Sequence, residues 1–233
     1  MFRTQEKRKA ITFSYDDGVT QDIRLIELLN KYGLRCTFNL NSELLSKKGM
    51  LIREGKRIAH YKIHADDVKS IYEGHEVAAH TLTHPNLTKC EDGEVIRQVE
   101  EDRKRLSELV GYEVVGMAYP CGGVNNDDRV VDLIKNNTGI RYCRTTILTE
   151  CLDPQDDLFR FKPTAYHMDF ERMMAMGREF LDLKTETPKI FYVWGHSYEM
   201  DYHADDWVKL EEFFKLISGH DDIFYGTNKE VLL

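Results

Sequence analysis

The stretch Ala10-Ile11-Thr12-Phe13-Ser14-Tyr15-Asp16-Asp17-Gly18 is a short apolar run, typical of a strand, that ends in two carboxylates and a glycine. Three further polar motifs also follow strand-like runs: His80-Thr81-Leu82-Thr83-His84-Pro85, Tyr119-Pro120-Cys121-Gly122 and Gly195-His196-Ser197. If these runs are parallel strands, all four motifs gather at one end of a sheet or barrel, where α/β barrels place their catalytic groups. Two carboxylates and two histidines gathered there could bind a divalent metal.

Other short runs rich in apolar, aromatic or β-branched residues predict further strands, and apolar residues recur at helical spacing between them. The predicted strands cover residues 10–15, 35–40, 76–79, 114–119, 140–144 and 190–194. The predicted helices cover residues 22–32, 94–110, 127–135 and 206–217. Regular alternation of strand and helix implies an α/β fold with a parallel sheet and outer helices, and the chain length suits a small or incomplete (β/α) barrel.

The bulk composition favours a single domain over residues 1–233. With 233 residues and 42% hydrophobic content, the chain can bury one substantial core, and no linker, repeat or low-complexity tract divides it. The formal net charge of -8 argues against nucleic acid or an anionic membrane as the main partner, because binding polyphosphate takes concentrated Lys and Arg. No apolar run is long enough for a secretion signal or a membrane span.

The cysteines indicate a reducing environment. Their number is odd and they contain no Cys-x-x-Cys pair, which suggests neither a disulfide framework nor a zinc knuckle. A cytoplasmic compartment fits this pattern best, although a chain whose export signal had been removed would look the same.

The paired carboxylates and the paired histidines each allow two interpretations, one as part of a metal site and one without a functional role. Asp16 and Asp17 end a predicted strand, where one can bind a metal while the other stays free as a base; the alternative is a common Asp-Asp-Gly turn. His80 and His84 stand four residues apart, so a helical turn would stack both imidazoles on one face, as metal sites often do. Pro85 makes a long helix there improbable and indicates a short turn. The alternative is two unrelated surface histidines.

These motifs resemble those of the polysaccharide deacetylase family, the NodB-homology carbohydrate esterases of family 4. Residues 12–18 resemble the first family motif, and residues 74–77 together with 80–87 resemble the second closely. Residues 117–122 align with the Arg-x-Pro-x-Gly motif, and residues 191–196 with the terminal strand that ends in the catalytic histidine. The matches occur in family order and cover most of the chain.

The resemblance implies a site and a fold. It assigns these roles: metal ligands Asp17, His80 and His84; general base Asp16; general acid His196; oxyanion contact Cys121, through its backbone amide. We further expect Tyr119 and Trp194 to contact the substrate. The fold would be a distorted (β/α) barrel of the NodB type, expected to have seven strands.

Two departures from the family pattern stand out. The arginine of the third motif, which orients the catalytic aspartate, is replaced by Ala118. Loss of that charge partner would let the pKa of the base rise, so we expect Arg144 to substitute for it, with Arg160 and Lys162 as rivals. The Asp-x-x-Asp-Trp motif is also not recognisable after Arg144.

Three side chains keep alternative readings. Cys121 lies near a histidine and could be a nucleophile, although its position matches a family site where the backbone does the chemistry. Trp194 is either core or pocket wall. Glu199 either fixes the tautomer of His196 or is a solvated loop acid.

The resemblance implies a metal-dependent hydrolase that removes N-acetyl groups from an N-acetylated sugar or oligosaccharide. Two imidazoles and a carboxylate suit Zn, Co, Ni or Fe, of which we expect zinc first. One alternative is a deacylase of the same fold that acts on a small non-sugar amide or an acetyl ester, as the two departures suggest. The other is a non-catalytic carbohydrate-binding member.

Overall fold

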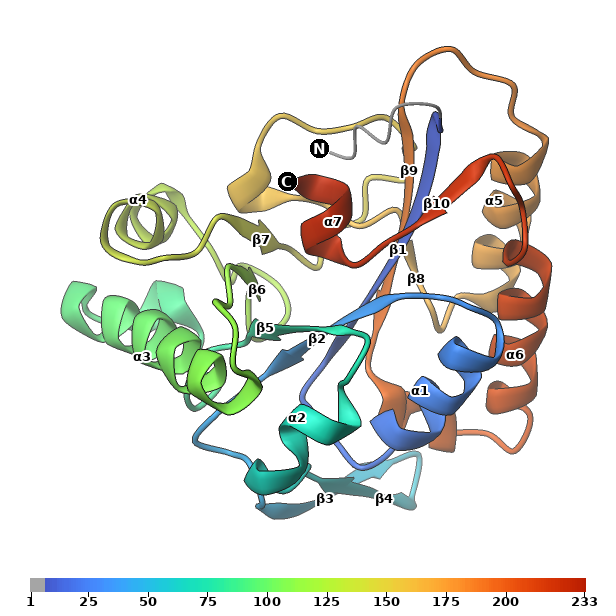
Figure 1. Ribbon diagram of the computed structural model, residues 1–233. Coiled ribbons are helices and arrows are strands. Elements are labelled where there is room, and N and C mark those ends of the chain that lie inside the picture. Colours follow the sequence, from blue (N-terminus) through green and yellow to red (C-terminus); the bar gives the residue numbers. More distant parts are fainter. Residues whose placement is uncertain (1–6) are drawn as a thin grey trace.

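A curled sheet of parallel strands forms the centre of the protein (Figure 1). The computed structural model describes residues 7–233. The sheet contains β1 (Lys9–Asp16), β2 (Cys36–Leu40), β5 (Glu76–Ala79), β6 (Gly116–Ala118), β7 (Tyr142–Arg144), β8 (Ala165–Tyr166), β9 (Lys189–Gly195) and β10 (Ile223–Tyr225). Seven of these strands follow in the order β7-β6-β5-β2-β1-β9-β8, and β10 pairs with the start of β1.

Helices lie around the outside of this sheet (Figure 1). They are α1 (Asp22–Lys31), α2 (Val68–Ile71), α3 (Asp92–Val110), α4 (Asp128–Asn137), α5 (Phe170–Asp182), α6 (Asp206–Ile217) and α7 (Asn228–Leu232). Short 3-10 helices are η1 (Ala65–Asp67), η2 (Leu87–Lys89), η3 (Leu158–Arg160) and η4 (Ser197–Asp201). Within residues 7–233, no helix has both the length and the apolar character needed to cross a bilayer.

The two edges of the sheet are connected by the segment between β7 and β8. Arg144, at the end of β7, forms a parallel bridge with Phe161. A few residues later, Ala165 of β8 pairs with Val193 of β9. The segment therefore draws the edges together, and the predicted distorted (β/α) barrel is confirmed.

Strand β1 shows why the sequence folds in this way. All eight of its residues are buried, as expected for a central strand of a parallel sheet that is covered on both faces. Side chains alternate, so Ile11, Phe13 and Tyr15 pack in the main hydrophobic core. Ser14 faces the interior of the barrel, where it accepts a hydrogen bond from Asn39 Nδ2 at 2.8 Å. Asp16, two residues further, therefore also points inward.

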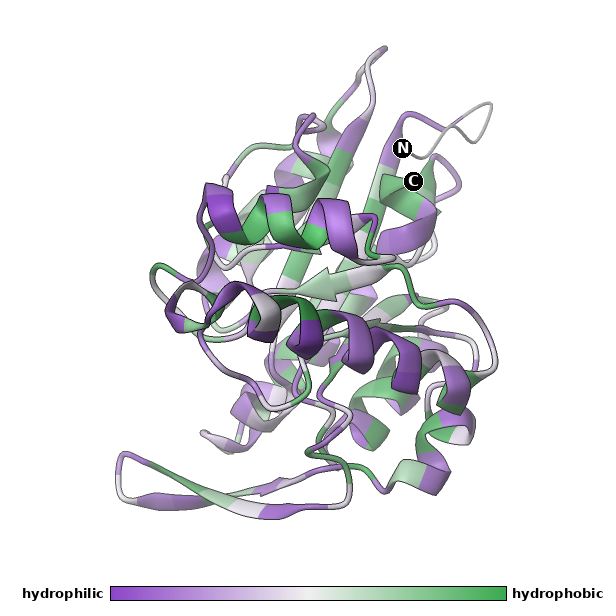
Figure 2. Cartoon of the chain, turned by 90° about the vertical axis from the view of Figure 1, so that its left-hand side faces the viewer, coloured by the Kyte–Doolittle hydropathy of each residue, from purple (hydrophilic) through white to green (hydrophobic). Residues whose placement is uncertain are grey.

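All predicted strands and helices are present, with ends that differ by at most two residues. The predicted set was incomplete, because it lacked β8, β10, α2, α5 and α7. It also lacked the antiparallel hairpin of β3 (Lys48–Arg53) and β4 (Lys56–Tyr61). This hairpin lies apart from the sheet, at the end of the molecule where the parallel strands finish, and it is largely hydrophilic (Figures 1 and 2).

Candidate active site

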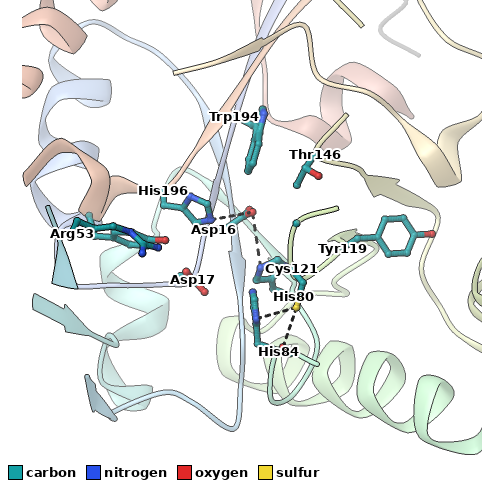
Figure 3. Close-up of a pocket in the computed structure, with 12 residues that line it drawn as sticks. Asp16, Asp17, Arg53, His80, His84, Tyr119, Cys121, Thr146, Trp194 and His196 are labelled. Carbon is teal, nitrogen blue, oxygen red and sulfur yellow. Dashed lines mark hydrogen bonds and ion pairs between the residues drawn. The ribbon is translucent and has the colours of Figure 1, made fainter. Parts of the chain in front are cut away.

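The four polar motifs lie together around one pocket at the carboxyl ends of the strands (Figure 3). The pocket has a volume of about 330 Å³. Its walls come from β1, β3 and the segments that follow β5, β6, β7 and β9. They are formed by Asp16, Asp17, Arg53, His80, His84, Tyr119, Cys121, Gly122, Thr146, Trp194, His196 and Tyr198.

Asp17, His80 and His84 form a cluster that fits a metal ion. One donor atom from each lies within 4.8 Å of the others, and two imidazoles with one carboxylate are a donor set that zinc and related metals accept. His80 Nδ1 faces the carbonyl oxygen of Ala118 at 2.8 Å, so that nitrogen donates and Nε2 remains as the acceptor for a metal. Each Asp17 oxygen already receives one hydrogen bond, and a carboxylate oxygen has a second lone pair for a metal.

The turn that brings the two histidines together is not helical. Thr81 and His84 have positive φ values of 67° and 62°, in a region that non-glycine residues rarely occupy. The imidazoles meet edge to face with 4.8 Å between ring centroids. The expected short turn is therefore present, but a strained loop and not a helical turn juxtaposes the rings. Asp17, with φ of 85°, is held in the same unusual region.

Asp16 is almost fully buried and held on both carboxylate oxygens. Asn39 Nδ2 donates to Oδ1 at 2.8 Å, and Arg144 forms an ion pair with Oδ2. His80 Nε2 and His196 Nε2 lie 3.9 Å and 4.0 Å from Oδ2. Burial by itself would raise the pKa of Asp16, but Arg144 and then the two histidines lower it, and the resulting pKa lies below its ordinary value.

Arg144 lies in the position that the sequence analysis expected of a replacement for the missing family arginine. Its side chain is fully buried, and its guanidinium carbon stacks over the Trp194 ring at 4.6 Å from the centroid. Of the two rivals, Arg160 pairs with Asp128 on the surface. The backbone of Lys162 forms two hydrogen bonds with the side-chain amide of Gln155, and neither rival forms an ion pair with Asp16.

His196 lies between Asp16 and Glu199. Its Nδ1 is 3.1 Å from Glu199 Oε2, and its backbone N–H donates to the same oxygen at 3.0 Å. Burial lowers the pKa of His196, but Glu199, followed by Asp16 and Asp17, outweighs burial and raises that pKa to about 9. Glu199 is therefore not a solvated loop acid: it is buried and also binds His167 Nε2 at 2.7 Å.

Tyr119, Cys121 and Trp194 contribute unequally to the pocket. The Tyr119 hydroxyl points away from it and donates to the carbonyl oxygen of Phe159 at 3.0 Å (Figure 3). Cys121 has φ of 68° and its Sγ lies 3.8 Å from His84 Nδ1. Burial raises the pKa of the Cys121 thiol, which keeps it protonated and disfavours the nucleophile reading. Trp194 forms part of the wall and supports Arg144.

Several residues that surround the site carry no recognisable signal in the sequence. His60 Nε2 and Lys62 Nζ approach the Asp17 carboxylate at 3.3 Å and 3.1 Å. The carboxylate of Asp102, on α3, accepts from the backbone N–H of His80 at 3.0 Å and so fixes that ligand's position. No motif signals these residues, because they reach the site from the unpredicted hairpin and from a helix face.

Comparisons with known proteins agree with this arrangement. The sequence model for polysaccharide deacetylase matches residues 3–142. The peptidoglycan-N-acetylglucosamine deacetylase PgdA of Listeria monocytogenes is 28% identical over 120 residues, which is 50% of this chain and 22% of that protein. The chitooligosaccharide deacetylase of Rhizobium leguminosarum biovar phaseoli is 31% identical over 121 residues, 50% of this chain and 42% of that protein. The match thus spans less than half the length of these relatives.

Solved structures share the fold at low sequence identity. A family 4 carbohydrate esterase from Streptomyces lividans superposes with a TM-score of 0.57 at 14% identity, over 94% of this chain and 93% of that one. Puue allantoinase superposes with a TM-score of 0.72 at 12% identity, over 98% of this chain and 90% of that one. Since the family sequence model covers more than half of the chain, and the barrel and motif positions agree with it, the chain belongs to the polysaccharide deacetylase family.

Proposed function

We propose that the protein is a metal-dependent hydrolase that removes an N-acetyl group from an N-acetylated sugar. The observation that carries this proposal is that one pocket holds both a cluster of metal-binding side chains and an acid–base pair of side chains. Asp17, His80 and His84 offer three converging donor atoms, and the Asp16 carboxylate lies beside them, 4.0 Å from His196 Nε2. A divalent cation, with zinc as our first choice, would act there as a Lewis acid that activates water and polarises an acyl oxygen.

Asp16 is suited to accept the proton of the attacking water. The Arg144 ion pair favours its ionised form at neutral pH. Arg144 and Asn39 also hold the Asp16 carboxylate in one orientation. General-base catalysis requires a base that is held within hydrogen-bonding distance of the proton that it removes.

His196 is suited to protonate the departing amine. With a pKa of about 9, its imidazole carries a proton on both nitrogens at neutral pH. Glu199 takes the Nδ1 side, which leaves the Nε2 proton toward the pocket. An amine is a poor leaving group unless it is protonated, so this donor matters more for an amide than for an ester. The Cys121 amide would complete the site by donating to the oxyanion.

The names of the relatives support a sugar substrate, since they describe deacetylases of peptidoglycan N-acetylglucosamine and of chitooligosaccharides. We test the proposal by measuring the metal content of the purified protein and acetate release from chitooligosaccharides and peptidoglycan fragments. We expect bound metal, and loss of acetate release on chelation that added Zn or Co reverses. Absence of both metal and acetate release would overturn the proposal.

A second candidate is a deacylase of a small non-sugar amide. The volume of about 330 Å³ favours it, because that value lies near the lower end of the range for ligand pockets. Including simple N-acetyl amides without a sugar ring in the same assay distinguishes the two candidates. Turnover of those amides, with none of the sugars, would favour the second.

A further inference from the structure

The β3–β4 hairpin carries basic side chains on the face that it turns toward the pocket. In an antiparallel pair, residues that lie opposite each other project to the same side. Leu51 pairs with Ile58, and both pack in a small cluster with Val19 and Tyr198 of the body. This identifies the inner face of the hairpin.

Arg53 lies on that inner face, two residues beyond Leu51 and opposite Lys56. Its side chain forms part of the pocket wall, on the side of Asp17 and His196 and away from Cys121 (Figure 3). Arg53 Nε donates to the hydroxyl of Tyr202 at 3.2 Å, and Lys56 Nζ donates to the carbonyl oxygen of Tyr202 at 2.6 Å. The guanidinium is thus held through one nitrogen, and the edge formed by its two terminal nitrogens remains for a ligand.

The carboxylates in and beside the pocket are each matched by a cation, whereas Arg53 and the neighbouring Lys56 on the hairpin have no carboxylate partner among residues 7–233. Each of the three carboxylates there has its own cation: Asp16 has Arg144, Asp17 has Lys62, and Glu199 has His196. Among residues 7–233, no carboxylate forms an ion pair with Arg53. A cation at the wall of a pocket whose other charges are compensated attracts an anionic group of a bound molecule.

We propose that Arg53 is a specificity-determining residue that binds a carboxylate of the substrate, so that the preferred substrate is an N-acetylated sugar that carries an acidic group. This inference rests on the proposed deacetylase function. A guanidinium with two free terminal nitrogens binds a carboxylate through two parallel hydrogen bonds, which would orient the sugar with its acetamido group toward the metal ligands.

The test compares N-acetylmuramic acid with its methyl ester, in which a methyl group replaces the negative charge of the carboxylate. We expect wild-type kcat/KM to be about tenfold higher for the acid, mainly through KM, which is the scale of one partly exposed charge-assisted pair. In Arg53→Met this preference should fall to about one, and Arg53→Lys should keep part of it. Raising NaCl from about 0.05 M to about 0.5 M should also weaken the wild-type preference.

Arg57→Met is the matched control. Arg57 lies on the outer face of the same hairpin, opposite Ile52, and is exposed; its loss should leave the ratio between the two probes at the wild-type value. A wild-type enzyme that hydrolyses both probes equally, or an Arg53→Met variant that loses activity on both by the same factor, would overturn the inference while deacetylation stands. Failure of the wild type on both probes and on neutral N-acetyl sugars would instead overturn the proposed function.

Discussion

Asp16 and Asp17 are neighbours in sequence, but their surroundings give them different tasks. Asp16 faces the barrel interior beside Arg144, whereas Asp17 belongs to the cluster with His80 and His84. We therefore expect Asp16→Asn to keep its metal while kcat falls by a factor on the order of 10² or more, because geometry survives but proton transfer does not. Asp17→Asn should lose the metal itself. Metal content and kcat, measured on the same samples, check both expectations.

The control for this pair is Asp132→Asn, which changes an exposed aspartate on α4 and should alter neither readout. If Asp16→Asn loses the metal while Asp17→Asn retains it, the two roles are exchanged.

Arg144 sets the ionisation of the base from a distant strand. Because its positive charge lowers the pKa of the buried Asp16 carboxyl, its removal raises that pKa. The base then becomes ionised only at higher pH. We expect Arg144→Met to move the acidic limb of the kcat/KM profile upward by about one pH unit or more, with metal content and circular dichroism unchanged. Arg160→Met, which removes a surface pair with Asp128, should leave the limb in place. If the acidic limb does not move in Arg144→Met, a group other than Arg144 sets the pKa of Asp16.

Among the strands, those that could be predicted from sequence are the buried ones, because burial requires a run of apolar residues. β1, β2 and β5 are buried at every position, so their sequences are short runs rich in apolar residues. The strand β8 has only two residues, and β10 has three of which only Ile223 is buried, so neither forms a buried apolar run of the kind that β6 and β7 form. In β3 most side chains are exposed, so it lacks the apolar alternation of a strand. Helix α5 does bury Met173, Met176, Gly177 and Phe180 at helical spacing, a signal that was present and missed.

Asp22 joins three elements through one buried carboxyl. It begins α1 and accepts hydrogen bonds from Ser197 Oγ of η4 and from the Tyr72 hydroxyl at 2.7 Å. Burial, the largest cause, raises its pKa from 3.8 to about 7. In the unfolded chain this carboxyl ionises near its ordinary pKa, so the folded state binds the additional proton between about pH 4 and pH 7. The stability that Asp22 contributes is therefore lost as pH rises through this window.

Asp22→Asn should remove this pH dependence, because an amide cannot ionise and can still donate to one hydroxyl and accept from the other. We expect the unfolding free energy of the wild type, relative to the variant, to fall by about 2 kcal/mol between about pH 5 and pH 8. Urea unfolding at both pH values measures it, with Asp132→Asn as the control. Parallel pH profiles for wild type and Asp22→Asn would contradict the raised pKa.

At the scale of the whole molecule, the site is an outcome of parallel strand order. β1, β5, β6, β7 and β9 all finish at one end of the barrel, so residues at the ends of these strands could be predicted to meet from sequence alone. The contributions of His60, Lys62 and Asp102 could not. They depend on how a hairpin and a helix fold back over that end, and this is decided by packing between segments far apart in the chain.

Because the folded barrel positions the metal ligands, its response to metal can be predicted. Asp17 and His80 are positioned by buried strands and by partners such as Asp102, so chelation should abolish activity and leave the far-ultraviolet circular dichroism unchanged.

A ligand that binds only the folded state adds about 2.7 kcal/mol to the free energy of unfolding at a concentration of 100 times its Kd. For a chain of this size that corresponds to a rise in Tm of about 5 to 10 °C. We expect added Zn to raise the Tm of the chelated wild type and of His64→Ala, whose histidine is exposed in a loop, but not that of His80→Ala or His84→Ala. Since this readout does not depend on turnover, an equal rise in all four proteins would place the metal elsewhere, whatever the activity assay reports.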